Sequence, residues 1–184
     1  MGGYELPTSL EVGGREYEIR SDYRAVLDVM AVMADPDIDG EERAVTALYV
    51  FYPDLDDMPA GDLEEAVGRM YWFINGGTDE RSGRRRPRLM DWEQDFPLIV
   101  SPVNHVMGRE VRAMDYLHWW TFLSAYREIG DCLFAQVVGI RRKLSQGRKL
   151  DKGERRFYDE NRDIVDLRKR LTEEEEENLR DWIT

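Results

Sequence analysis

The chain contains few of the residues that metal centres and redox sites need. Its 184 residues include one cysteine, Cys132, and two histidines, His105 and His118. A single thiol excludes an intramolecular disulfide and a cysteine-only zinc site, and neither histidine belongs to a metal-binding pattern. We therefore expect no metal and no cofactor. Because Cys132 lies in an apolar run, we expect an inert, buried thiol.

Long apolar runs are also missing. No stretch approaches the ~20 apolar residues of a membrane-spanning helix, and the N-terminal MGGYELPTSLEVGG does not have the pattern of a signal peptide. The net charge is −12, which disfavours binding to nucleic acid or to an anionic membrane. We expect a protein of the reducing cytoplasm, with neither nucleic acid nor a membrane as a partner.

The apolar residues that are present recur with helical spacing. Two short alternating runs flank Gly13-Gly14, which predicts a β-hairpin near the N-terminus. After it, the spacing changes to that of amphipathic helices. We expect such helices from about Ser21 to Met33, over 41–52, over 62–75, from Asp91, on either side of Gly130-Asp131, over 153–170 and from Thr172 to about Trp182. The predicted fold is mainly α, a helical domain with a short N-terminal β-hairpin; two small helical lobes are the alternative.

Composition divides the chain into four segments. We expect a hairpin plus helical lobe over 1–76, an Arg-rich flexible linker over 77–90, a helical core over 91–145 and charged C-terminal helices over 146–184. Prolines at 97 and 102 should shorten or kink the helix that begins at Asp91. Farther on, Asp151 and Glu154 have the spacing of a capping box.

Candidate catalytic and calcium-binding patterns are incomplete. His118 and Asp115 could form a dyad on one helix face, but no serine nucleophile accompanies them. We interpret His118 as a structural residue, a half-buried ring with a hydrogen-bond partner. The segment 35–40, DPDIDG, resembles the start of a calcium loop, but Thr46 stands where the loop needs a bidentate glutamate. We therefore expect a solvated loop there, and a protein that is not an enzyme.

The one basic cluster consists of Arg81, Arg84, Arg85, Arg86 and Arg88. No aromatic residues alternate with these arginines, so the stacking surface of a single-strand nucleic-acid binder is missing. Two interpretations remain open. The cluster is either a solvated loop tip or a contact with an acidic partner, such as a second copy of this chain.

The tryptophan pair in HWW (118–120) predicts a core rather than a reaction. Adjacent residues on a helix point about 100° apart, so Trp119 and Trp120 must contact different neighbours. Apolar residues continue from Phe122 into the next predicted helix, which ends in Ile140-Arg141. This pattern is typical of a central helix in an all-α core.

These residues resemble a family of siphophage proteins encoded between the major tail protein and the tape measure protein. The resemblance covers most of residues 6–145, including Leu-Pro-x-x-Leu at 6–10, the short hairpin and Asp-Tyr-Arg at 22–24. The family motif corresponds to Asp95, His118, Trp119, Trp120, Phe122, Ile140 and Arg141.

The resemblance implies a tail assembly chaperone that binds and shields the tape measure protein during tail assembly. It also implies weak self-association, residence in the host cytoplasm and absence from the mature virion. One alternative is a structural tail or tail-completion subunit that is retained in the virion. Another is an acidic regulator of a host protein.

Overall fold

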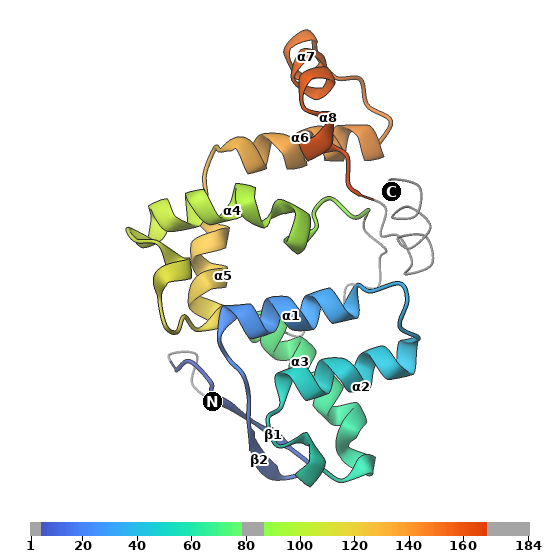
Figure 1. The fold of residues 1–184 in the computed structure, drawn as a ribbon, viewed down its shortest axis with the longest axis vertical. Helices are drawn as coiled ribbons and strands as arrows, with labels where there is room; N and C mark the ends of the chain where they lie inside the picture. The colour runs from blue at the N-terminus through green and yellow to red at the C-terminus, as the bar shows by residue number, and fades with distance from the viewer. Residues whose placement is uncertain (1–4, 79–86, 169–184) are drawn as a thin grey trace, which may run out of the picture. The chain divides into compact units, whose positions relative to one another are not determined.

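The computed structural model describes residues 5–78 and 87–168, and the chain is mainly helical there (Figure 1). An antiparallel hairpin comes first, with β1 (Ser9–Val12) paired to β2 (Arg15–Glu18). Gly13 and Gly14 form its turn with φ of 59° and 75°, a conformation that favours glycine. The helices are α1 (Tyr23–Met33), α2 (Gly40–Phe51), α3 (Leu63–Ile74), α4 (Trp92–Met107), α5 (Trp119–Arg127), α6 (Leu133–Ser145), α7 (Lys152–Glu160) and α8 (Arg162–Val165). The predicted fold class is confirmed.

The chain divides into two compact units. Among the described residues, unit 1 comprises 5–78 and 116–121, and unit 2 comprises 87–115 and 122–168. The HWW segment therefore packs with the first part of the chain, whereas the sequence pattern led us to place it at the centre of the second. The reason is that the indoles of its two tryptophans donate hydrogen bonds to backbone carbonyls at the end of α3.

Helices α1 and α2 of unit 1 begin where the sequence predicts. The Asp22 side chain accepts a hydrogen bond from the Arg24 amide, and the Asp39 side chain accepts two from the amides of Glu41 and Glu42. These carboxylates satisfy amide groups that have no partner inside the helix. In the loop that resembles a calcium site, Asp39 thus acts as a helix cap.

Helix α3 of unit 1 also lies where we expected it. Its fully buried residues are Ala66, Met70 and Phe73. The helix ends at a pair of glycines: the Gly76 amide donates to the Phe73 carbonyl and the Gly77 amide to the Trp72 carbonyl. Both glycines have positive φ, as is typical of helix C-termini.

Helix α4 opens unit 2 and runs through both of its prolines. The Asp91 side chain caps it by accepting from the Gln94 amide, as predicted, and it ends at Gly108 with φ of 67°. Of the two predicted effects of Pro97 and Pro102, shortening or kinking, the shortening does not occur. Burial of apolar residues between and beside them stabilises the helix despite the missing hydrogen bonds.

The C-terminal helices of unit 2 partly match the prediction. The capping box of Asp151 and Glu154 is present. The single helix expected over 153–170 is instead α7 followed by α8, because Asn161 leaves the helical conformation and its side chain donates to the Phe157 carbonyl. The helix expected from Thr172 lies outside the described residues.

A small apolar cluster joins these helices. Val137 and Ile140 of α6 are buried together with Val165 of α8, and Phe157 of α7 packs against them. Cys132, which we expected to be buried, is only half-buried, because it precedes α6 and its sulfur accepts from the Ala135 amide. Over 5–78 and 87–168, no helix is both long enough and apolar enough to cross a membrane.

Candidate functional site

The residues of the family motif form two separate clusters. His118, Trp119 and Trp120 belong to unit 1. The remaining motif residues, Asp95, Phe122, Ile140 and Arg141, belong to unit 2. Each cluster holds together segments that lie far apart in the sequence.

The two tryptophans of the first cluster bind the end of α3. Trp119 is fully buried and its indole Nε1 donates to the Ile74 carbonyl at 2.8 Å. Trp120 is half-buried and its Nε1 donates to the Phe73 carbonyl, also at 2.8 Å. Carbonyls in the last turn of a helix lack their regular amide partner, and the Trp119 indole satisfies one of them at Ile74. The Trp120 indole adds a second hydrogen bond to the Phe73 carbonyl, which also accepts from the Gly76 amide.

Aromatic packing reinforces this contact. The Trp120 ring stacks on Phe73, with centroids 5.7 Å apart, and meets the edge of Trp72 at 5.5 Å. Gly77 lies against the same ring, and a Cβ added there would come within 3.0 Å of Trp120. The glycine is therefore required by its φ of 81° and by the nearby indole.

His118 has a backbone partner for each ring nitrogen. The Trp120 amide donates to Nδ1 at 3.0 Å, so the proton of the neutral ring lies on Nε2, which donates to the Pro7 carbonyl at 3.0 Å. Burial lowers the pKa of His118, opposed by the hydrogen bond to Pro7. The predicted hydrogen-bond partner is present, although the ring is buried rather than half-buried. No ring nitrogen remains for an acid–base dyad.

The start of α1 holds the same segment through backbone contacts. The Leu117 amide donates to the Asp22 carboxylate at 2.8 Å, and the Leu117 carbonyl accepts from the Tyr23 amide at 2.9 Å. The Trp119 amide donates to the Ser21 carbonyl at 2.8 Å. Asp22 therefore caps α1 and binds a segment 95 residues away.

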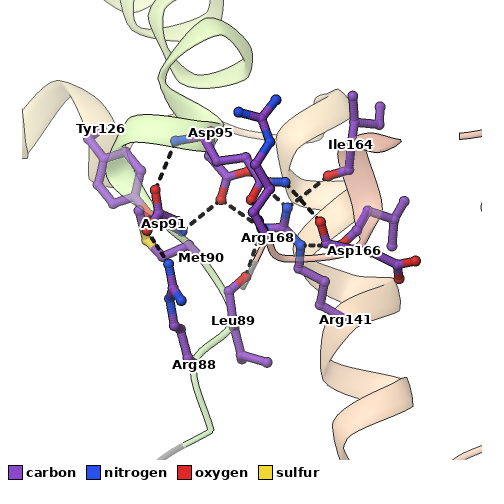
Figure 2. Close-up of polar contacts among 12 residues, drawn as sticks. Arg88, Leu89, Met90, Asp91, Asp95, Tyr126, Arg141, Ile164, Asp166 and Arg168 are labelled. Carbon is purple, nitrogen blue, oxygen red and sulfur yellow. Dashed lines mark hydrogen bonds and ion pairs between the residues drawn. The ribbon is translucent and has the colours of Figure 1, made fainter. Parts of the chain in front are cut away.

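The second cluster centres on a buried ion pair (Figure 2). Asp95 is 0% exposed and Arg141 is 5% exposed. The guanidinium binds the carboxylate with two parallel hydrogen bonds, Nη1 to Oδ2 at 2.6 Å and Nη2 to Oδ1 at 2.9 Å. This bidentate geometry is the strongest form of the arginine–carboxylate interaction.

Arg141 also binds three backbone carbonyls. Its Nε donates to Val165 at 2.6 Å, Nη1 to Leu89 at 3.1 Å and Nη2 to Ile164 at 2.8 Å. Together with the two bonds to Asp95, all five N–H donors of the guanidinium are used. One side chain of α6 thus connects α4, the segment before α4 and the end of α8 (Figure 2).

Further polar contacts extend this network. Asp95 accepts from the Asp91 amide at 2.9 Å, and Arg88 forms an ion pair with Asp91. Gln94 donates to the Asp166 carbonyl and accepts from the Arg168 amide, each at 2.9 Å. Arg88 is the one member of the predicted basic cluster within the described residues. The positions 81, 84, 85 and 86 lie outside them.

The other two motif residues of unit 2 are part of its apolar core. Phe122 is fully buried, and its ring lies 6.3 Å from the ring of Trp92. Ile140 is 1% exposed and belongs to the apolar cluster of α6 and α8.

A sequence pattern could have identified the ion pair. Asp95 shares a helix face with Ile99 and Val103, and Arg141 shares one with Phe134 and Val137. A charged residue on an apolar helix face requires a buried partner of opposite charge.

The polar side chains of both clusters bind the protein's own backbone. The nitrogens of His118 and Arg141 are all engaged by the chain itself. Within the described ranges, no group of three or more histidine, cysteine or acidic residues could hold a metal ion. The contacts of the two clusters therefore stabilise the folds of the two units.

Comparison with known proteins gives one match. No curated protein and no solved structure matches the chain. A family model described as Bacteriophage Gp15 protein matches residues 4–167, which include all the motif residues of both clusters. The chain therefore belongs to the Bacteriophage Gp15 protein family.

Proposed function

We propose that this phage protein is a tail assembly chaperone that binds the tape measure protein and shields it until tail tube subunits polymerise around it. The observation that carries the proposal is the motif centred on HWW and on Asp95 with Arg141, which resembles proteins encoded beside the tape measure protein of siphophages. Membership of the Bacteriophage Gp15 protein family supports a phage role. In this proposal the protein is not an enzyme.

Exposed apolar side chains support a binding role. Val45 and Tyr49 lie one turn apart on α2 and are 38% and 51% exposed. Tyr71 on α3 is 41% exposed. Apolar side chains on a helix surface can bind the apolar face of an amphipathic helix, which is the expected form of a tape measure segment. A net charge of −12 would keep such a coat dissolved.

The proposal also covers the oligomeric state of the protein and its location. We expect weak self-association, because a coat along a long polypeptide requires many neighbouring copies. We expect it in the host cytoplasm during assembly and outside the finished virion. Neither nucleic acid nor a membrane is a proposed partner.

Co-expression with fragments of the tape measure protein tests the proposal. We expect at least one otherwise insoluble fragment to become soluble and to co-purify. Binding should persist from about 0.15 M to about 1 M salt, because apolar contacts are not screened whereas exposed charge pairs are. Failure to solubilise or co-purify any fragment would contradict the proposal.

A pair of matched variants locates the binding surface. Val45→Ser with Tyr49→Ser should reduce co-purification, because it removes exposed apolar area from α2. Leu133→Ser with Leu144→Ser changes two similarly exposed residues of α6 and serves as the control. If the control loses binding and the α2 variant keeps it, the α2 surface is not the site.

A further inference from the structure

Charge is divided unevenly between the two units. The described residues of unit 1 include seventeen acidic and five basic residues, a net charge of −12. Those of unit 2 include thirteen acidic and fourteen basic residues, a net charge of +1. The excess negative charge of the described chain is therefore carried by unit 1, and the average over the sequence conceals this.

Basic residues gather on α6, α7 and the loop between them. Positions 141–156 include eight basic and two acidic residues. Apart from the buried Arg141 and half-buried Lys143, these bases are exposed, and we call them the basic strip: Arg142, Arg148, Lys149, Lys152, Arg155 and Arg156. Arg156 pairs with Glu160. Within the described parts of the chain, no ion pair joins the other five to an acidic residue.

The basic strip is held on a folded scaffold. An ion pair between Lys143 and Glu154 joins α6 to α7. Phe157 of α7 packs against the apolar cluster that includes Ile140 of α6, and the capping box fixes the first turn of α7. Arg142 on α6 and Lys152, Arg155 and Arg156 on α7 therefore project from helices whose packing is defined, and Arg148 and Lys149 lie in the loop that joins these helices. This arrangement favours recognition of a shaped partner.

Unit 1 presents a complementary surface. Residues 54–65 include six acidic residues and no basic one. Two short 3-10 turns, Leu55–Asp57 and Ala60–Asp62, order this acidic segment, and Leu55 is buried beneath it. The exposed acids are Asp54, Asp56, Asp57, Glu64 and Glu65.

We propose that the basic strip of one copy binds the acidic segment of a second copy. Because the two surfaces differ, this contact is head-to-tail and can continue from copy to copy as an open chain. Such a chain has the form required to cover a long polypeptide. The inference rests on the self-association in the proposed function and is independent of tape measure binding.

The partner that the basic strip binds is a protein rather than nucleic acid. No aromatic side chain lies among the charges of positions 141–156, so the bases of a single strand would have no stacking surface. The net charge of −12 on the described residues of unit 1 of the same molecule repels a polyanion but attracts the strip of a neighbouring copy.

Sedimentation velocity of the purified full-length protein, without the tape measure protein, tests the contact. We expect concentration-dependent oligomers at low salt that dissociate as salt rises. Lys149→Glu with Lys152→Glu should weaken self-association by about tenfold or more, because two exposed attractions become repulsions. Arg109→Glu with Arg127→Glu changes the net charge equally outside the strip and should leave most of the self-association intact.

The complementary variant makes the test specific. Asp54→Lys with Asp57→Lys should also weaken self-association by about tenfold or more. An equal mixture of the strip variant and this variant should restore it, because each then offers the other an oppositely charged surface. A monomer at all salt concentrations, or an unchanged strip variant, would overturn the inference, as would a mixture that does not associate. If the strip variant loses a duplex DNA binding that the wild type shows but keeps its self-association, the basic strip binds nucleic acid and the inference is also overturned.

Discussion

Removing the carboxylate of the buried ion pair should destabilise unit 2 severely. Arg141 is only 5% exposed. Asp95→Ala therefore leaves its buried guanidinium with an uncompensated charge and with two of its five donors unpaired. Breaking a buried ion pair on one side typically lowers the free energy of unfolding by about 3–5 kcal/mol. This is a large part of the roughly 5–15 kcal/mol that stabilises a typical domain.

Arg141→Ala should destabilise unit 2 at least as much. It leaves Asp95 as a buried charge and also removes the donor for three carbonyls, those of Leu89, Ile164 and Val165. Each buried carbonyl without a partner costs about 1–3 kcal/mol. The double variant should be less destabilised than the sum of the two single variants by about 2–3 kcal/mol, because each single variant already breaks the shared interaction.

Urea unfolding followed by circular dichroism measures these free energies, and hydrogen exchange of unit 2 peptides assigns them to the right unit. The exposed pair of Asp159 and Arg162 provides the control. Its side chains are 47% and 61% exposed, so Asp159→Ala should change the free energy of unfolding by less than about 1 kcal/mol. A coupling between Asp95 and Arg141 below about 0.5 kcal/mol would refute the assignment of this pair as the organiser of unit 2.

Three further predictions concern local contacts. Trp119→Ala should lower the free energy of unfolding by about 3–5 kcal/mol, and Trp120→Ala by less because its ring is only half-buried; equal effects would be inconsistent with the packing on α3. Burial lowers the pKa of His118, so the contribution of the neutral ring to stability should be fully present above the ordinary histidine pKa of about 6.5 and should be lost as pH decreases toward the folded-state pKa. Thermal melts across pH should show this loss, and His118→Gln should abolish it. Asp151→Ala should cost about 1 kcal/mol by breaking the capping box with Glu154, measurable as a lower urea midpoint, and no change would mean that the cap does not stabilise α7.

Most of the fold could be predicted because its determinants are local. Asp22, Asp39, Asp91 and Asp151 each cap a helix that begins at the next residue, and after the first three of them the apolar spacing identifies the buried face. The break at Asn161 escaped prediction because it depends on one residue leaving the helical conformation inside an otherwise helical pattern.

The organisation of the motif residues could not be predicted in the same way. Trp119 meets a carbonyl 45 residues away, and Asp95 meets a guanidinium 46 residues away. Periodicity indicates that such residues face inward but does not identify the partner. The surface is still less predictable, because composition averages the acidic unit 1 with the basic strip of unit 2.

The ratio of this protein to the tape measure protein, compared between two preparations, tests the central claim most directly. Quantitative mass spectrometry would be applied to tape measure complexes isolated from infected cells and to purified virions. A tail assembly chaperone should be present in many copies per tape measure protein in the first preparation and absent from the second. A fixed number of copies in purified virions, or absence from the isolated complexes, would contradict the proposed function.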